Sequence, residues 1–501
     1  MNPKLRELRT LLSEINDLRY AGNVLYWDQA TYMPPGGADA RASQLATLAR
    51  LEQEKFTQPA IGYLLDELQS YADGLPYDSD EASLIRVTRR DYERAIRVPP
   101  EFVGELNGHT SHTYEVWAKS RLANDFAATS PYLEKTLDLS RQLANYFPGY
   151  DHIIDPLIAY QDYGMTATEI SVLFNDLRGE LVPLVQAITS QPPADDSCLR
   201  RVYPEAQQDT ISRELATCIG YDFSRGRLDK THHPFTINFS RGDVRITTRY
   251  REDYLAEGLY NALHEGGHAL YEQGISPALE GTYLAEGTSD GVHESQSRLW
   301  ENLVGRSRAF WQYWYPRFQK TFPSQLDNTS LEEFFRAINK VTPSLIRTDA
   351  DEVTYNLHVM LRFDLEMALL DGRLAIKELP DAWRERYQSD LGITPQDDRD
   401  GVLQDVHWFG SVIGGVFQGY TLGNILSAQF YAAALQAHPQ IPDEIAQGNY
   451  KTLLAWLIQN IYQHGAKFTT KELIERITGG PICIEPYIAY LKKKYGELYD
   501  I

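Results

Sequence analysis

The sequence predicts a mainly α-helical protein with a small β-sheet. Through most of the chain, apolar residues recur every three or four positions, which is typical of helices packed against a core. One short region, 235–248, instead alternates apolar and polar residues as a β-hairpin does. A chain of 501 residues can bury a large core, either as roughly two to four domains or as one large fold. We interpret residues 1–501 as one structural unit.

The N-terminal part is predicted to begin with a helical hairpin. A break at Pro34–Gly37 separates two segments with helical spacing, and a loop at 191–196 ends this mainly helical part near residue 190. The apolar positions of the two segments are Leu5, Leu8, Leu12, Ile15 and Leu18, then Leu45, Leu48 and Leu51.

The predicted hairpin lies just before the most informative part of the chain. Its first strand carries Phe235, Ile237 and Phe239, and its second strand runs over 244–248 after the turn residues 240–243. A strand edge can align an extended peptide through main-chain hydrogen bonds. From the pattern alone, a purely structural hairpin remains equally open.

The segment His264–His268 reads His-Glu-Gly-Gly-His within a helical pattern, and Gly274 is expected to cap that helix. Residues four apart share a helix face, so the two imidazoles could bind one metal ion. Glu265 would then reach a water molecule activated by the ion, which is the chemistry of hydrolysis. Gly266 and Gly267 each cost about 1 kcal/mol relative to alanine inside a helix, so we expect a substrate or another backbone to approach closely there.

A catalytic zinc site usually has three protein ligands, so a third is expected downstream. Glu272 lies on the same helix and is better placed to support His268. Glu286 stands in an expected turn, whereas Glu294 begins the next helical pattern. We favour Glu294, with Glu286 as the alternative, because a second helix gives a rigid set of ligands.

Composition excludes several classes of partner. The net charge of -21 argues against binding nucleic acid or an anionic membrane. No apolar run approaches the length of a membrane span, and the first seven residues carry charges where a signal peptide is apolar. We therefore expect a cytoplasmic protein. The chain has three widely spaced cysteines, Cys198, Cys218 and Cys483, which suggest neither disulfides nor a thiolate zinc site.

The pentad followed by Glu294 resembles the carboxypeptidase Taq family of metallocarboxypeptidases. Segments near the N-terminus, Trp27-Asp28 and Met33–Gly36, are similar to the family too. Five further segments resemble its signatures and stand in the family's order: His233–Phe235, Asp243–Thr247, His293–Gln296, Ile346–Asp351 and Gly401–Trp408.

The resemblance implies a large helical fold of the neurolysin type with its small β-sheet beside a deep cleft. Residues 1–190 would cover the cleft and residues 191–501 would carry the metal site. It also implies a homodimer that removes single residues from peptides with a free C-terminus, with broad tolerance and poor activity at proline. Zn²⁺ is expected from the ligand types, and Co²⁺ or Mn²⁺ could replace it.

Three residues are candidates for the chemistry itself. Glu265 would act first as general base and then as general acid. The oxyanion of the tetrahedral intermediate needs a donor besides the metal, and the resemblance to related helical peptidases suggests His407 and Tyr420. Tyr420 could equally be one of 32 tyrosines packed in a core.

Three other residues are candidates for binding substrate. A free carboxylate is best recognised by arginine, so Arg245 and Arg347 are expected to bind the peptide C-terminus, although either could be an ordinary ion-paired side chain. His233 is placed in the cleft by the resemblance alone. The rival functions are an oligoendopeptidase or dipeptidyl carboxypeptidase of related fold, and a peptide-binding protein without catalysis, which an intact Glu265 disfavours.

Overall fold

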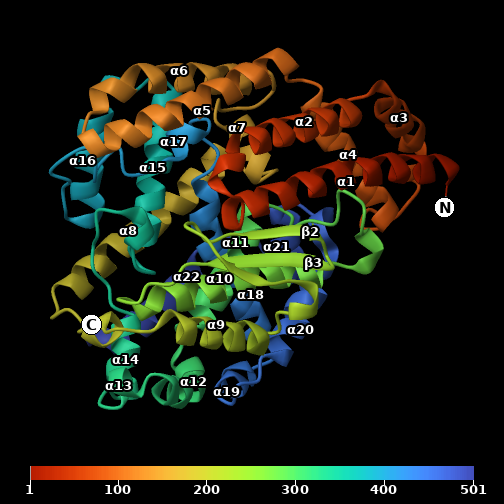
Figure 1. Ribbon diagram of the computed structural model, residues 1–501. Coiled ribbons are helices and arrows are strands. Elements are labelled where there is room, and N and C mark those ends of the chain that lie inside the picture. Colours follow the sequence, from red (N-terminus) through yellow and green to blue (C-terminus); the bar gives the residue numbers. More distant parts are fainter. Residues whose placement is uncertain (1) are drawn as a thin grey trace. The chain divides into compact units, whose positions relative to one another are not determined.

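The computed structural model describes residues 2–501 and confirms the predicted fold class (Figure 1). The described chain is mainly helical and contains one three-stranded sheet. It groups into two compact units. Unit 1 contains the chain up to Ile96, Asp195–Ile338 and Phe430–Pro481, and unit 2 contains Arg97–Ala194, Asn339–Gln429 and Ile482–Ile501. Each unit draws on both sides of residue 190, where the sequence suggested a boundary, and one catalytic unit over 1–501 stays a prediction.

Unit 1 begins with the predicted helical hairpin. The side chain of Asn2 accepts a hydrogen bond from Lys4 N and so caps α1, which packs against α2. The helices of this unit are α1 (Pro3–Thr31), α2 (Ala38–Phe56), α3 (Pro59–Asp73), α4 (Asp80–Ala95), α9 (Glu205–Ile219), α10 (Leu255–Gly274), α11 (Asp290–Arg298), α12 (Arg308–Thr321), α13 (Pro323–Leu326), α14 (Leu331–Ile338), α19 (Ile441–Ile445), α20 (Lys451–Asn460) and α21 (Thr470–Thr478).

The predicted hairpin is present as β2 (Thr236–Ser240) and β3 (Asp243–Thr248), which pair antiparallel. A third strand, β1 (Leu228–Lys230), pairs parallel with β3 and was not predicted, because three residues are too few to show a period. The order β1-β3-β2 leaves β2 at an edge. Both β2 and β3 contact α10, so the sheet lies against the helix that carries the pentad.

Helix α10 holds the pentad in its interior, as predicted. A Cβ on Gly267 would lie 2.6 Å from the carbonyl oxygen of Gln296 in α11, and one on Gly266 would lie 3.1 Å from Ile219 Cδ1. The expected close approach of another backbone is confirmed at Gly267, whereas Gly266 meets only the end of a side chain. The prediction for Gly274 was wrong: it is the last helical residue rather than a left-handed cap, and the ring of Tyr462 occupies the space of its missing side chain.

Helix α11 begins where the hydroxyl of Ser289 accepts a hydrogen bond from Val292 N. It continues into a π-helical segment, Leu299–Val304. Wider turns of this kind are rare and are often found at functional sites.

Unit 2 is also helical. Helix α15 forms much of its core, with most of its side chains buried. Its helices are α5 (Pro100–Ala123), α6 (Phe126–Asn145), α7 (Asp155–Gln161), α8 (Ala167–Thr189), α15 (Tyr355–Leu370), α16 (Leu379–Leu391), α17 (His407–Gly410), α22 (Glu485–Tyr499) and the first part of α18 (Gln418–Ala437). None of the helices in residues 2–501 combines the length and apolar character needed to cross a bilayer.

A buried carboxyl group in unit 2 should make stability depend on pH. Glu366 Oε1 accepts hydrogen bonds from Trp408 Nε1 at 2.7 Å and Gly414 N at 3.2 Å, and burial raises the pKa of Glu366 from 4.5 to about 8. Between these values the folded state keeps a proton that the unfolded state loses. The free energy of unfolding should therefore fall by a few kcal/mol as pH rises from about 4.5 to about 8.

Replacing Glu366 with Gln keeps an acceptor for Trp408 and removes the titration. We expect Glu366→Gln to lose this part of the pH dependence, measured by urea unfolding of wild type and variant at pH 5 and pH 8. If the two proteins differ equally at both pH values, Glu366 is not neutral in the folded state.

Candidate metal centre and active site

Helices α10 and α11 bring together the three side chains that the sequence proposed as metal ligands. One ligand atom from each of His264, His268 and Glu294 lies within 4.8 Å of the other two. Glu294 Oε2 is 3.5 Å from His264 Nε2 and 3.4 Å from His268 Nε2. Glu286, the alternative, forms an ion pair with Arg19 at 2.5 Å.

This geometry fits a divalent ion. Ligand atoms about 2.0–2.2 Å from a tetrahedral zinc ion are about 3.3–3.6 Å apart, close to both distances from Glu294 Oε2. Two imidazoles and a carboxylate are also the donors of many hydrolytic sites and leave a position open for water.

Charged neighbours hold two of the ligands. Arg298 donates to Glu294 at 2.7 Å and to Glu301 at 3.1 Å, and Glu301 Oε2 lies 2.9 Å from His264 Nδ1. Burial acts to raise the pKa of both carboxyl groups, but Arg298 and the imidazoles outweigh it. The pKa of Glu294 is held well below its ordinary value, and that of Glu301 is lowered to about 2. Both groups are therefore carboxylates.

Support for His268 follows a different route from the one predicted. Glu272 does not bond to His268; it lies 2.8 Å from His293 Nε2, and His293 Nδ1 lies 2.6 Å from His268 Nδ1. Burial lowers the pKa of His268 to about 3, which favours the neutral imidazole that a metal requires.

Glu265 is on α10, beside the candidate ligands, and is 6% exposed. Thr236 of β2 donates a hydrogen bond to Glu265 Oε2 at 2.7 Å and contacts the carbonyl oxygen of Glu265 at 3.0 Å. Burial raises the pKa of Glu265. A carboxylate with a raised pKa and a fixed orientation is suited to accept a proton.

Arg245 lies on β3 with its guanidinium between two aromatic rings. Its centre is 4.3 Å from the ring of Trp27 and 4.7 Å from that of Phe239, and its Nε and Nη2 donate to Asp243 at 2.9 and 2.8 Å. Side chains alternate along β3, so Arg245 and the buried Val244 lie on opposite faces of the sheet. Val244 pairs with Asn238 of β2. The sheet therefore separates Arg245 from the face that contacts α10.

His233 is exposed and lies three residues before β2. Within residues 2–501 it forms no hydrogen bond, so the structure adds no contact that would assign it a role. The resemblance remains its only support.

The other three candidates belong to unit 2, where they meet around one carboxylate. Asp405 accepts hydrogen bonds from Arg347 Nε at 2.6 Å and from Arg362 Nε at 3.1 Å, and its Oδ1 lies 2.5 Å from His407 Nδ1. His407 Nε2 is 3.3 Å from Tyr420 OH. The pKa of Asp405 is held well below its ordinary value, because the cations outweigh the effect of burial. The sequence thus proposed nine residues for one cleft, and the structure places six in unit 1 and three in unit 2.

Sequence reasoning missed several residues with a part in these networks, among them Thr236, Glu301, His293 and Asp405. Each had a weak local signal: Thr236 is a polar residue on an alternating strand, Glu301 follows Glu294 by seven positions on one helical pattern, and His293 and Asp405 stand next to or near candidates. Only their partners distant in sequence identify them.

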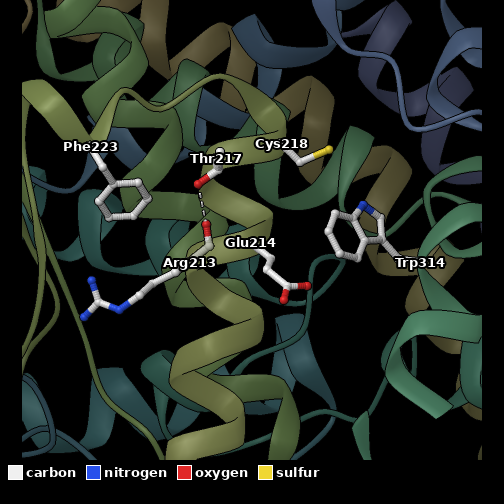
Figure 2. Close-up of a pocket in the computed structure, with 6 residues that line it drawn as sticks. All are labelled: Arg213, Glu214, Thr217, Cys218, Phe223 and Trp314. Carbon is white, nitrogen blue, oxygen red and sulfur yellow. Dashed lines mark hydrogen bonds between the residues drawn. The ribbon is translucent and has the colours of Figure 1, made fainter. Parts of the chain in front are cut away.

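A surface hollow elsewhere in unit 1 contains none of the candidate residues. It has a volume of about 710 Å³ and a mostly apolar lining from α9, α12 and Phe223 (Figure 2). Figure 2 shows the Thr217 hydroxyl turned back onto its own helix, where it donates to the carbonyl of Arg213 at 2.8 Å. Glu214 is paired with Arg317, and the thiol of Cys218 lies 3.7 Å from the carbonyl oxygen of Gly448.

A helical fold with a candidate three-ligand metal site and a buried glutamate beside it is typical of a metal-dependent hydrolase. The family model for Carboxypeptidase Taq (M32) metallopeptidase matches residues 7–495. This chain therefore belongs to the carboxypeptidase Taq (M32) family, and it is a metallocarboxypeptidase that acts on peptides.

Individual relatives agree along nearly the whole chain. Thermostable carboxypeptidase 1 of Thermus thermophilus is 42% identical over 95% of both chains, and Carboxypeptidase 1 of Bacillus subtilis is 35% identical over 99% of this chain and 98% of its own. The crystal structure of the M32 carboxypeptidase from Deinococcus radiodurans R1 matches with a TM-score of 0.97 and 47% identity, covering 100% of both chains.

Proposed function

We propose that this enzyme releases single residues from the C-termini of peptides at a metal site formed by His264, His268 and Glu294. The observation that carries the proposal is the position of Glu294 Oε2, 3.5 Å from His264 Nε2 and 3.4 Å from His268 Nε2, with buried Glu265 on the helix of the two histidines. We propose Zn²⁺ as the ion, and Co²⁺ or Mn²⁺ as ions that could replace it.

The bound ion would polarise the scissile carbonyl and lower the pKa of a water molecule. Glu265 takes a proton from the attacking water and then delivers it to the leaving amine. The hydroxyl of Thr236 keeps Glu265 Oε2 in place and leaves the other oxygen of the carboxylate available for the proton. The raised pKa of Glu265 supports this role, because it brings the group closer to neutral pH.

Main-chain recognition supports broad tolerance for side chains. The carbonyl oxygen of Phe235 accepts a hydrogen bond from Thr247 N, so Phe235 and Thr247 form a hydrogen-bonded pair between the strands. Hydrogen-bonded and non-hydrogen-bonded pairs alternate along an antiparallel ladder. The main-chain groups of Thr236 and Asn238 therefore point away from β3, to the outer edge of β2. The side chain of Asn23 already donates a hydrogen bond to the carbonyl oxygen of Asn238. A peptide paired with this edge is read through its backbone, and proline is disfavoured because it lacks an N–H group.

The oxyanion and the substrate carboxylate would be bound by the remaining candidates. His407 Nδ1 donates to Asp405, so its Nε2 would donate to the oxyanion when the ring carries both protons, and the hydroxyl of Tyr420, 3.3 Å from Nε2, would be the second donor. Arg245 uses Nε and Nη2 for Asp243, which leaves Nη1 for a carboxylate, and Arg347 keeps two N–H groups beyond its bonds to Asp405 and Tyr355. His233 is proposed as a cleft residue.

Substitution of Arg245 tests its part in binding the peptide C-terminus. Arg245→Met keeps the apolar contact with Trp27 and removes the charge. We expect KM for a peptide with a free C-terminus to rise by about 10-fold or more, since a charged hydrogen bond contributes about 1.5–3 kcal/mol, with a smaller change in kcat. Steady-state kinetics checks this, and an unchanged KM would remove Arg245 from the substrate site.

Product analysis tests the function as a whole. A peptide of about ten residues, its C-terminally amidated form and a blocked dipeptide are incubated with the metal-loaded enzyme, and the products are identified by mass. We expect stepwise loss of single residues from the free C-terminus and little cleavage of the amide. Internal cuts would favour an oligoendopeptidase, and release of residue pairs a dipeptidyl carboxypeptidase.

We propose further that the enzyme is a cytoplasmic homodimer. The three cysteines are free thiols, as expected in a reducing compartment, and the dimer rests on the family resemblance. Sedimentation equilibrium should give twice the chain mass of 57.1 kDa, and a monomer mass would contradict the dimer.

A further inference from the structure

The two histidines of the candidate metal site are held by different partners. His264 Nδ1 faces the carboxylate of Glu301 at 2.9 Å. His268 Nδ1 instead faces a second imidazole, that of His293, at 2.6 Å. His293 is not one of the three candidate ligands, and its ring lies between His268 and the carboxylate of Glu272.

The chemistry of the ligand fixes the direction of these hydrogen bonds. His268 turns Nε2 toward Glu294 Oε2, so a metal bound there leaves the ring proton of His268 on Nδ1. His293 Nδ1 must then accept that hydrogen bond, and the proton of His293 lies on Nε2. His293 Nε2 donates in turn to Glu272 Oε1, 2.8 Å away, and carboxylate oxygens only accept.

Glu272 is itself held from two sides. Its Oε2 accepts from Asn238 Nδ2 of β2 at 2.7 Å, and its Oε1 accepts from Gly287 N at 3.2 Å. Glu272 is 6% exposed, so its carboxylate is shielded from water. These two hydrogen bonds hold the carboxylate of Glu272 in the position from which it contacts His293.

The ring of His293 has little freedom to turn. It lies 5.2 Å from the ring of Tyr271, whose hydroxyl accepts from Thr288 N at 3.2 Å. On another side it packs against Gly287, where an added Cβ would collide with His293 Cδ2. The packing presents Nδ1 of His293 to His268 and Nε2 to Glu272.

We propose that His293 is a positioning residue of the metal site: backed by Glu272, it accepts the Nδ1 proton of His268 and fixes the tautomer and orientation in which His268 Nε2 binds the ion. The inference rests on the metal site proposed above and adds a partner to it. Loss of such an outer partner typically weakens metal binding 10–100-fold.

The test compares two replacements of His293. His293→Phe keeps a ring against Tyr271 and removes both nitrogens, whereas His293→Asn places an amide oxygen near the position of Nδ1. Competition with a chromophoric chelator should give a Kd for Zn²⁺ weaker by about 10–100-fold in His293→Phe. His293→Asn should recover most of that loss, and the visible spectrum of bound Co²⁺ should shift only in the Phe variant.

His268→Ala is the control for the site itself, and thermal unfolding of the metal-free proteins checks that each variant folds. A Kd for His293→Phe within twofold of wild type overturns the proposal, and so does equal weakening by Phe and Asn. Zn²⁺ binding by His268→Ala with the wild-type Kd would instead show that the metal site is wrong. If His293→Phe does not fold, Gly287→Ala displaces the ring of His293 and should weaken Zn²⁺ binding in the same way.

Discussion

Glu265→Gln is expected to lower kcat for release of a C-terminal residue by about 10²–10⁴-fold, the range that general acid–base catalysis contributes. Glutamine has nearly the same shape and its carbonyl can still accept from Thr236, so the site should stay assembled. It cannot take up a proton at neutral pH. Steady-state kinetics on a peptide with a free C-terminus measures the loss.

Metal content separates this effect from damage to the site. Glu265→Gln should bind Zn²⁺ with the wild-type stoichiometry, because Glu265 is not one of the three ligands. His264→Ala serves as the control that loses both metal and activity. Wild-type rates in metal-loaded Glu265→Gln would mean that another group acts as the base.

Gly267→Ala is expected to destabilise the fold and the metal site together. The new Cβ would lie 2.6 Å from the carbonyl oxygen of Gln296 and 2.7 Å from the Cα of Ser297, and backbone atoms cannot rotate away. Helix α11, which carries Glu294, has to shift. Overpacking of this kind costs about 1–3 kcal/mol, against about 1 kcal/mol gained from the helix preference of alanine.

The neighbouring glycine provides a matched control for Gly267→Ala. A Cβ on Gly266 meets only Ile219 Cδ1 at 3.1 Å, the flexible end of a side chain, so Gly266→Ala should be neutral or stabilising. Urea unfolding measures stability and chelator competition measures Zn²⁺ affinity. If both variants match the wild type in both assays, the contact between α10 and α11 does not position Glu294.

The parts of the candidate site that could be placed from the sequence are those set by local periodicity. Four-residue spacing places His264 and His268 on one helix face, and a new helical pattern supplies Glu294, so the three could be proposed before their atoms were seen together. The alternation at 235–248 likewise predicted the hairpin. These signals lie within one or two turns of helix or one strand.

What the sequence missed depends on contacts between distant segments. Thr236 meets Glu265, and Asn238 meets Glu272, only because β2 packs on α10. Glu272 was expected to support His268 directly, but one more imidazole fits between them. The spacing of residues along the chain does not show how far apart two packed segments lie.

One expectation failed because a position was judged by its residue type alone. Gly274 looked like a helix cap, yet the ring of Tyr462 is what requires glycine there. Tertiary packing decides the residue at this position.

The most direct test of the metal site is anomalous diffraction from crystals of the Zn²⁺-loaded enzyme at the zinc absorption edge. The account predicts one peak per chain, bonded to His264 Nε2, His268 Nε2 and Glu294 Oε2 at about 2.0–2.2 Å. A peak bound by Glu272 or Glu286 in place of Glu294, or no peak between α10 and α11, would contradict it.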